Sequence, residues 1–582
     1  MRNEEAARVF NRIADLLEIK GESIYRVLAY RRAVEEIRSY PRDIEEVWKA
    51  GELKQIPGVG EAIAEKIDEL FRTGKMEYFE KLKREIPESL SDLLQVGGVG
   101  PKKVARFWKE LGITTREGLE AAAREGRLRS MEGMGEKSET RILESLAALR
   151  RRETGRIPLG RARESAARLL ARLRSLPGVE RAEAAGSLRR WRETVGDLDF
   201  VVSASESESV RRAIVEWSDI VRVLGQGETK VSLELQEGLR LQLWVHPPER
   251  FGSAWQYATG SQAHSVRLRE LALDRGLSLS EHGFKRKDGK EILCASEDQV
   301  YTTLGLPWIP PELREDRGEF EAARAGRMIG LVQESDLRGE LHTHTLWSDG
   351  AVDVRELADA AREMGLEYLV ITDHSKSLGM VQGLDEARVR EQRAEVKAIQ
   401  RSVGPALRIL QGAEVEILAD GSLDFPDSVL AGFDLVVASV HTSLRQPRSQ
   451  MTERVVRALA NPHVDVLGHP TGRLFGKRDP SDLDMEAVYR AAAENQVALE
   501  LNCHPERLDL NDIQARAALG FGCMLAIDTD AHHPDHLRLR EYGVGMARRA
   551  WAGKHSVVNT WPLEDLEAWL GRRVGGVRRD RS

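Results

Sequence analysis

The chain is poor in cysteine and contains no long hydrophobic run. Its three cysteines, Cys294, Cys503 and Cys523, show no paired spacing, which argues against a disulfide framework and against a zinc finger. No stretch approaches the ~18 apolar residues that a transmembrane helix needs. The charged start Met1-Arg-Asn-Glu-Glu has no apolar segment of the signal-peptide type. These absences predict a cytoplasmic protein that does not enter a membrane.

A surplus of positive charge is also missing. The 94 acidic residues outnumber the 87 basic residues, so the formal net charge is −7. A surface that is basic throughout is therefore excluded, and any contact with nucleic acid has to come from local patches. The length of 582 residues predicts several domains rather than one hydrophobic core.

Side chains that bind metal ions gather in the last part of the chain, where eleven of the 14 histidines follow Ser335. His342 and His344 end an expected strand, and the alternation of a strand puts both rings on one face. Other candidates follow apolar runs, which places them at the strand ends on one rim of a barrel or sheet. Imidazole with carboxylate is a ligand set for zinc, manganese or iron. The candidate ligands are His342, His344, Asp349, His374, Glu414, His441, His469, Asp530 and His532.

One histidine at a strand end is more often structural than a ligand, but the number and order of these nine favour a metal site. From about Leu337 to about Pro562 the chain resembles the polymerase and histidinol phosphatase (PHP) domain. The motifs that carry the resemblance are His342-Thr-His-Thr-Leu-Trp-Ser-Asp349-Gly, Thr372-Asp-His374-Ser, Gly412-Ala-Glu414-Val, Ser439-Val-His441, Gly468-His469-Pro-Thr-Gly-Arg473 and Asp530-Ala-His532.

The resemblance implies a distorted seven-stranded β/α barrel that holds up to three ions of Mn²⁺ or Zn²⁺. Neighbouring ions of this kind hydrolyse phosphoesters. Arg473 is a candidate to hold a phosphate oxygen, and a surface arginine is the alternative. The implied ligand groups are His342, His344, Glu414 and Asp530 for the first ion, Glu414, His441 and His469 for the second, and Asp349, His374 and His532 for the third.

The first 150 or so residues read as helices, and three short Gly-rich segments repeat one pattern between them. The segments are Ile56-Pro-Gly-Val-Gly60, Val96-Gly-Gly-Val-Gly100 and Met131-Glu-Gly-Met-Gly135. They resemble helix-hairpin-helix motifs, which hold the DNA backbone at a helix N-terminus without reading sequence. A plain turn is the alternative for any one of them. The candidate DNA-binding residues are Gly58, Gly60, Gly98, Gly100, Lys102 and Lys103.

Residues 23–70 resemble the small N-terminal domain of X-family DNA polymerases. Lys66 matches the lysine that forms a Schiff base with an abasic site in that family, with Arg26 and Tyr30 at supporting positions. Ala62 stands where some members carry a second lysine. A lysine that contacts backbone phosphate or solvent is the alternative for Lys66.

A nucleotidyltransferase pattern follows. Asp197 and Asp199 are two residues apart on an expected strand, so both carboxylates share one face and suit two Mg²⁺ or Mn²⁺ ions. With the preceding Gly-Ser turn they resemble the palm of X-family polymerases, and Trp308-Ile-Pro-Pro-Glu-Leu-Arg314 resembles part of the thumb. The residues that the resemblance places around a nucleotide are Gly186, Ser187, Arg189, Arg190, Tyr257 and Gly260.

Three departures from the family pattern predict a weakened palm. Gln242 stands at the position of the third carboxylate, and a neutral amide cannot accept the primer proton or balance a metal charge. Trp191 replaces a small glycine, and Ala258 replaces an aromatic residue after Tyr257. We expect nucleotide binding with weak or absent extension.

The order of motifs resembles that of bacterial and archaeal X-family DNA polymerases with a C-terminal PHP domain. The fold class expected is multidomain α/β. The expected parts are a helical DNA-binding and lyase-like domain at 1–88, helical fingers at 89–153, a palm at 154–250, a thumb at 251–320, a linker at 321–336, the PHP domain at 337–572 and a basic, disordered tail at 573–582.

The resemblance implies a DNA-repair enzyme that fills gaps in the palm and trims 3′ ends or abasic sites in the barrel. Its partners would be gapped, nicked or abasic DNA and deoxynucleoside triphosphates, with the protein itself a monomer. A repair nuclease whose palm only holds DNA is one alternative. A non-enzymatic, structure-specific DNA-binding protein and a small-molecule phosphatase are the others, although nine ligands argue against the first and the hairpins against the second.

Overall fold

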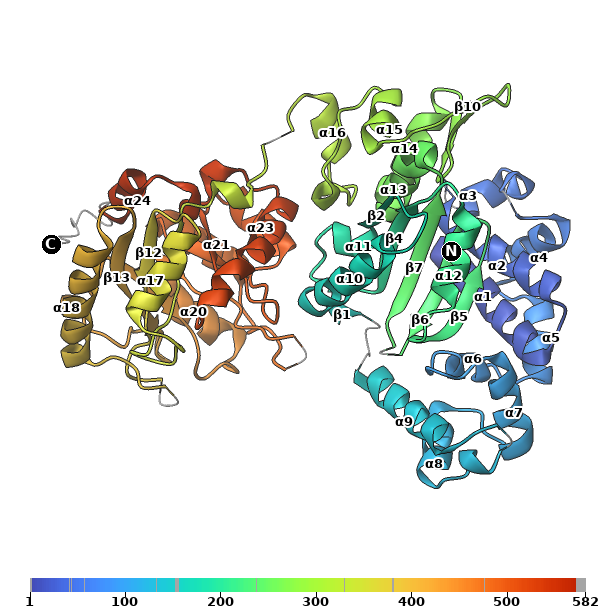
Figure 1. Ribbon diagram of the computed structural model, residues 1–582, viewed down its shortest axis with the longest axis horizontal. Helices are drawn as coiled ribbons and strands as arrows, with labels where there is room; N and C mark the ends of the chain where they lie inside the picture. Colours follow the sequence, from blue (N-terminus) through green and yellow to red (C-terminus); the bar gives the residue numbers. More distant parts are fainter. Residues whose placement is uncertain are drawn as a thin grey trace. The chain divides into compact units, whose positions relative to one another are not determined.

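The computed structural model of the chain describes residues 3–40, 42, 44–56, 58–131, 133–151, 156–236, 238–328, 330–378, 381–475 and 477–571 (Figure 1). The basic tail expected at 573–582 lies outside the described residues. The first compact unit comprises Met1–Ile157, Ala162–Arg189 and Thr194–Arg324, and the second comprises Pro158–Arg161, Arg190–Glu193 and Ala325–Ser582. In the part of the chain that is described, no helix has the length and apolar character needed to cross a membrane.

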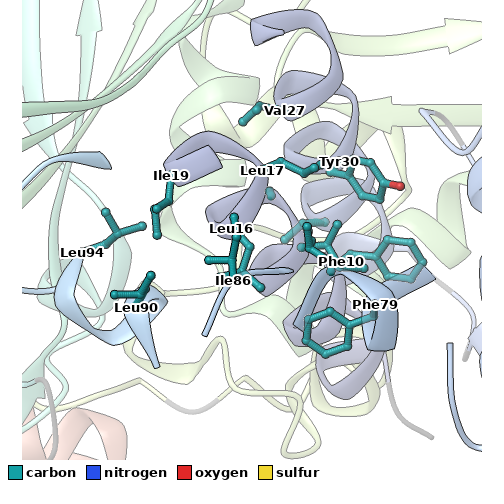
Figure 2. Close-up of a cluster of buried hydrophobic side chains, with 14 of the residues drawn as sticks. Phe10, Leu16, Leu17, Ile19, Val27, Tyr30, Phe79, Ile86, Leu90 and Leu94 are labelled. Atoms are coloured by element: carbon teal, nitrogen blue, oxygen red, sulfur yellow. The ribbon is translucent and has the colours of Figure 1, made fainter. Parts of the chain in front are cut away.

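The beginning of the first unit is helical. Apolar residues at helical spacing on the first two helices, such as Phe10, Leu16 and Tyr30, meet Phe79 and Leu90 in one buried cluster (Figure 2). The helices are α1 (Asn3–Lys20), α2 (Ile24–Ser39), α3 (Ile44–Lys49), α4 (Glu61–Thr73), α5 (Glu77–Glu85), α6 (Leu90–Leu93), α7 (Pro101–Leu111), α8 (Arg116–Arg124) and α9 (Glu136–Arg151).

The segment expected to be the palm forms a five-stranded sheet in the order β2-β4-β7-β6-β5. The central strands β4 and β7 are parallel, and the other neighbours are antiparallel. Buried Leu198 and Phe200 alternate along β4 with Asp197 and Asp199, so the carboxylates occupy the face opposite these apolar side chains. The strands are β2 (Arg181–Ala184), β4 (Asp197–Ser203), β5 (Ile220–Gln226), β6 (Lys230–Leu235) and β7 (Arg240–His246).

The thumb follows the palm and depends on a buried ion-pair network. Glu297 accepts hydrogen bonds from both terminal nitrogens of Arg314 (2.7 and 3.1 Å), which is fully buried, and from the indole N–H of Trp308 (3.0 Å). Its elements are α13 (Phe251–Thr259), α14 (Gln262–Leu273), β8 (Leu277–Ser280), β9 (Gly283–Arg286), β10 (Glu291–Ile292), α15 (Glu297–Thr303) and α16 (Glu319–Arg324).

The second unit is built on seven parallel strands in the order β11-β12-β13-β14-β15-β16-β17. A parallel bridge between Thr343 and Ala531 joins the segments that follow the first and last strands and nearly closes the sheet. The expected distorted β/α barrel is therefore confirmed. The strands are β11 (Gly339–Glu340), β12 (Tyr368–Ile371), β13 (Arg408–Glu416), β14 (Leu435–Ser439), β15 (Val466–Leu467), β16 (Ala498–Asn502) and β17 (Leu525–Asp528).

Helices surround the barrel strands (Figure 1). Apolar residues from successive strands, among them Leu341, Val370, Val437 and Val466, form one buried cluster inside the sheet. This packing leaves the carboxyl ends of the strands for polar side chains. The longer helices are α17 (Val354–Glu363), α18 (Glu386–Val403), α20 (Arg448–Leu459), α21 (Met485–Asn495), α22 (Asp512–Gly520), α23 (Arg540–Arg549) and α24 (Leu563–Leu570).

The thumb network predicts a large cost for one neutralising substitution. Burial by itself raises the pKa of Glu297, but Arg314 and Arg189 outweigh it and hold the pKa well below its ordinary value. Glu297→Gln removes the charge that both buried arginines face, so we expect it to lower the free energy of unfolding of the first unit by ~3–5 kcal/mol.

Urea unfolding of the full chain measures this effect. Glu291→Gln is the matched control because Glu291 pairs with Arg250 at 2.7 Å with a side chain that is 47% exposed, and such pairs contribute less than ~1 kcal/mol. Equal effects of the two substitutions would contradict the structural role given to Glu297.

Candidate metal centre and nucleic-acid interfaces

The nine candidate ligands of the barrel come together at the carboxyl ends of its strands. Glu414 lies on β13, His344 follows β11, and Asp530 follows β17. Eight of the nine, all except His469, form three overlapping groups of possible ligands. The groups are His342, His344 and Asp530; His374, Glu414 and His441; and His344, Asp349, His374 and His532.

Glu414 is the centre of this arrangement and is 1% exposed. Its Oε1 lies 3.2 Å from His441 Nε2 and 3.1 Å from His469 Nε2. Its Oε2 lies 3.3 Å from His342 Nε2 and 3.5 Å from His344 Nε2. His374 Nδ1 is closer still to Oε2, at 2.9 Å, so one carboxylate faces two imidazoles on Oε1 and three on Oε2.

Asp530 and Asp349 occupy the other side of the cluster. Asp530 Oδ1 lies 3.1 Å from His344 Nε2 and 3.7 Å from His342 Nε2. Asp349 Oδ1 lies 3.4 Å from His532 Nε2 and 3.6 Å from His374 Nε2. His344 also lies 3.8 Å from Asp349, and His532 lies 3.7 Å from Asp530. The division of these residues among separate ions stays a prediction.

Two buried glutamates that the sequence analysis did not single out orient the ligands. Glu500 Oε1 lies 2.6 Å from His342 Nδ1, and Glu416 Oε2 lies 2.9 Å from His441 Nδ1. Each glutamate holds one ring nitrogen and turns the other toward Glu414, which is the usual way to set the tautomer of a metal-binding histidine. Both lie on barrel strands at even spacing from other inward-facing residues, and that alternation was the available signal in the sequence.

The chemistry of this cluster fits a cation. His342 Nε2 and both ring nitrogens of His344 are buried without a hydrogen-bond partner among the described residues. Burial, with His374 and His532 adjacent, lowers the pKa of His344 to about 3, which keeps the ring neutral and its lone pair available. Burial would also lower the pKa of His374, but Glu414 and Asp349 raise it to about 10. The carboxylates thus attract positive charge that a metal ion can supply, and this cluster can bind metal.

Arg473 has a different set of partners from the one expected. It is 9% exposed, and its Nε donates to the carbonyl of Arg507 at 2.9 Å while Nη2 donates to the carbonyl of Leu508. These bonds tie Arg473 to the loop after β16. A direct contact of Arg473 with phosphate stays a prediction.

The palm carboxylates meet the Gly-Ser turn at short range. Gly186 has φ of 57°, and a Cβ placed on it would lie 1.9 Å from Oδ2 of Asp199. Only glycine allows this approach. Ser187 follows on the short helix α11 (Gly186–Arg189), beside the carboxylate pair.

Gln242 lies among these carboxylates. It is the register partner of Asp199 on the neighbouring strand. Its Nε2 donates to Asp197 Oδ2 at 3.4 Å, and its Oε1 accepts from Ser232 Oγ at 2.6 Å. The amide of Gln242 therefore turns its donor, not its acceptor, toward Asp197.

The other residues predicted to contact a nucleotide lie on different elements of the chain. Arg189 is held by Glu297 through two bonds of 2.6 and 2.7 Å and stacks on Trp255, so its side chain belongs to the thumb network. Arg190 and Trp191 lie in Arg190–Glu193, which groups with the second unit.

Tyr257 and Gly260 lie at the end of α13. The Tyr257 ring meets Trp244 edge to face at 5.4 Å, and Gly260 caps the helix with φ of 65°. Ala258, between them, packs in a small apolar cluster with Trp244. For all these residues, contact with a nucleotide stays a prediction.

The three Gly-rich segments share one backbone geometry. Gly58, Gly98 and Gly133 have φ of 76°, 78° and 76°, a left-handed conformation that favours glycine. Gly60 and Gly100 cap the helices α4 and α7, and a Cβ on either would meet nothing within 4 Å. The same turn bond closes each segment, from Val59 N–H to Ile56, from Val99 to Val96 and from Met134 to Met131.

The two lysines of the second segment differ. Lys102 is exposed, whereas Lys103 is half-buried and its Nζ donates to the carbonyl of Gly98 at 2.8 Å. Burial, with Arg141 nearby, lowers the pKa of Lys103. Lys102 is therefore the lysine that is open to an outside phosphate.

Lys66 belongs to an aromatic and basic cluster on the helices of the first domain. Its Nζ lies 5.1 Å from the centre of the Tyr78 ring and donates to the carbonyl of Ala62 at 2.8 Å. Arg26 Nη2 donates to Tyr78 Oη at 3.0 Å, and Tyr30 stacks on the same ring. The structure thus brings Lys66, Arg26 and Tyr30 together around Tyr78, a residue that the sequence analysis missed because it lies on another helix.

Comparisons with known proteins agree with this division. Residues 1–76 match the helix-hairpin-helix domain and residues 90–148 the SAM-like helix-hairpin-helix tandem. Residues 254–315 match the DNA polymerase beta thumb, and residues 340–504 match the PHP domain.

Several curated proteins are similar to this chain over different shares of its length. A probable phosphatase of Acetivibrio thermocellus is 36% identical over 28% of this chain and 65% of its own. DNA polymerase lambda of Rattus norvegicus is 26% identical over 52% of this chain and 54% of its own. The DNA polymerase/3′-5′ exonuclease PolX of Bacillus subtilis is 36% identical over 98% of this chain and 100% of its own. A match of this identity along both whole chains means that the chain belongs to the PolX family of DNA polymerase/3′-5′ exonucleases.

Proposed function

We propose that the barrel is the working active site of a DNA-repair enzyme and hydrolyses phosphodiesters at 3′ ends and abasic sites of gapped or nicked DNA. As a member of the PolX family, the protein is an enzyme that acts on DNA. The single observation that carries the proposal is the buried Glu414 carboxylate, which lies within 3.5 Å of five histidines, with Asp349 and Asp530 in the same cluster.

The nine ligand residues would hold up to three ions of Mn²⁺ or Zn²⁺ in the groups that the resemblance implies. Ions so bound lower the pKa of water and neutralise phosphate charge. Glu500 and Glu416 hold His342 and His441 in the tautomer that leaves Nε2 free. The hairpins would hold the DNA backbone through Gly58, Gly60, Gly98, Gly100 and Lys102.

The palm has a weaker claim to activity. Asp197 and Asp199 would share Mg²⁺ or Mn²⁺ with the triphosphate of a nucleotide, and Ser187 would contact a phosphate oxygen. Gln242 cannot accept the primer proton. We therefore infer nucleotide binding with weak extension. A palm that only holds DNA is the second candidate, which the Gln242–Asp197 hydrogen bond favours. Lys66, among Arg26, Tyr30 and Tyr78, is the proposed nucleophile for an abasic-site aldehyde.

His344→Ala and Asp530→Ala should abolish 3′→5′ resection in the presence of Mn²⁺. Each removes a buried ligand, and the loss should also lower the bound metal, measured by elemental analysis. DNA affinity at moderate salt should stay within about twofold because the hairpins supply backbone contacts. His555→Ala, at an exposed histidine, is the matched control. Normal cutting by both ligand variants would disprove the assignment.

Gln242→Asp should raise single-nucleotide insertion on gapped DNA, on the order of 10²-fold, because it restores a proton acceptor beside Asp197. Asp197→Ala in the same background should remove the gain. No gain from Gln242→Asp would favour the DNA-holding palm. Robust Mg²⁺-dependent extension by the unmodified chain would show that the third carboxylate is not needed here.

Lys102→Ala should weaken DNA binding equally for all sequences and lower the slope of affinity against salt by ~1, as expected for one lost phosphate contact. Lys103→Ala is the paired control because its Nζ is taken by Gly98. It should leave the salt slope unchanged. Equal loss of slope in both variants, measured by fluorescence anisotropy, would contradict the inward role of Lys103.

A further inference from the structure

Two loops of the barrel are bound to each other beside the metal cluster. One loop follows β15 and contains Arg473, and the other follows β16 and contains Arg507. The N–H of Phe475 donates to the carbonyl of Glu506 at 2.8 Å, and Arg473 donates to the carbonyls of Arg507 and Leu508. The two loops therefore support one another over several residues.

A buried carboxylate completes the connection in the opposite direction. Asp509 is fully buried and accepts from the backbone N–H groups of Thr471 and Gly472 at 3.0 and 2.8 Å. Each loop thus supplies a charged side chain that binds the backbone of the other. The backbone at Arg507 is consequently held from both sides, which limits where its side chain can point.

The guanidinium of Arg507 reaches the metal cluster without a hydrogen-bond partner there. The side chain is 17% exposed, and its Nε lies 3.9 Å from Oδ2 of Asp530, beyond hydrogen-bonding distance. Its Nη1 is buried with no hydrogen-bond partner among the described residues. Asp530 Oδ2 instead accepts from Asn502 Nδ2 at 3.1 Å. A buried charged donor left in this state is costly unless a ligand completes it.

A second arginine, Arg478, lies on the other of the two loops. Arg478 is half-buried, and its Nε donates to the carbonyl of Gly472. Burial lowers the pKa of Arg478, and the positive charge of Arg507 lowers it further, with Asp509 acting in the opposite sense. Both arginines belong to the paired loops, and their positive charge would attract an anion there.

We propose that Arg507, with Arg478 on the other loop, forms an oxyanion subsite that binds a non-bridging oxygen of the DNA phosphate presented to the metal cluster. The planar fork of a guanidinium suits phosphate oxygens. Arg473 is a positioning residue for Arg507 in this arrangement. The inference rests on the proposed function of the barrel and adds the group that recognises the substrate.

Arg507→Ala, Arg507→Lys and the control Lys477→Ala test the subsite in the full chain with Mn²⁺ bound. Lys477 forms an exposed pair with Glu506 on the same two loops, at 2.7 Å. We expect Arg507→Ala to lower kcat/KM for a 3′-labelled strand ~100-fold or more, as removal of one oxyanion donor does. Arg507→Lys should retain part of the rate because it keeps the charge without the fork. Lys477→Ala should match the unmodified protein.

Inorganic phosphate is the probe that does not depend on cutting. It should raise the melting temperature of the Mn²⁺-loaded protein and inhibit it competitively, and both effects should be lost in Arg507→Ala while the bound metal stays unchanged. If Arg507→Ala loses metal and excess Mn²⁺ restores the rate, Arg507 only supports Asp530 and the subsite is disproved. Equal phosphate effects in all variants would also overturn it.

Failure of the proposed function gives a different pattern. In that case the unmodified protein and Lys477→Ala would both be inactive with Mn²⁺. The subsite would then be supported if phosphate raised the melting temperature of the unmodified protein but not that of Arg507→Ala. It would be rejected if both melting temperatures changed equally. The subsite is therefore upheld or rejected by that shift alone.

Discussion

The metal cluster of the second unit depends on one carboxylate that is buried among imidazoles. Glu414 is 1% exposed and lies within 3.5 Å of a histidine nitrogen on both of its oxygens. A buried carboxylate is costly unless positive charge compensates it. In the barrel, histidines from the ends of several strands surround this carboxylate. Without a positive charge, the buried carboxylate destabilises the cluster. The same buried carboxylate therefore attracts cations.

The two candidate active sites differ in how well their charge is arranged. In the barrel, each of Glu500 and Glu416 holds a histidine by one nitrogen and frees the other. In the expected palm, Gln242 Nε2 donates to Asp197 Oδ2 at 3.4 Å, where a carboxylate could only accept. The barrel therefore has both ligands and their supports. The expected palm has the Gly-Ser turn and two carboxylates on one strand, and Gln242 stands opposite Asp199 on the next strand.

Several charged side chains that the sequence suggests as ligand-binding residues also hold protein groups. Arg189 belongs to the network of Glu297 in the thumb, Lys103 closes its own hairpin, and Arg473 secures a neighbouring loop. Each is a long, polar side chain in a motif that suggests phosphate binding. Their donors are taken by protein groups at 2.6 to 2.9 Å. Arg507, outside any of the motifs considered, is the arginine whose donor remains open at the metal cluster.

The sequence alone determined the parts of the protein whose signals are local. Period-two and period-3.6 patterns predict strands and helices, Gly-x-Gly marks the hairpin turns, and Asp197 and Asp199 two residues apart share a strand face. The order of the nine candidate ligands predicts the barrel, because they lie at or after the ends of successive strands. Family resemblance supplied the position of Gln242, and the register between β4 and β7 sets it opposite Asp199.

Only the tertiary structure decided which side chains meet across elements. Tyr78 joins Lys66 from another helix, Glu500 reaches His342 over 158 positions of chain, and the loop of Arg473 meets the loop of Arg507. Strand alternation can place Glu500 on the inner face, but the local sequence does not tell which side chain any of these residues meets, because each partner lies on another element. A polar side chain can bind a ligand if its donors or acceptors have no hydrogen-bond partner within the protein. Tertiary packing decides which donors have such partners, because a buried donor is normally hydrogen-bonded.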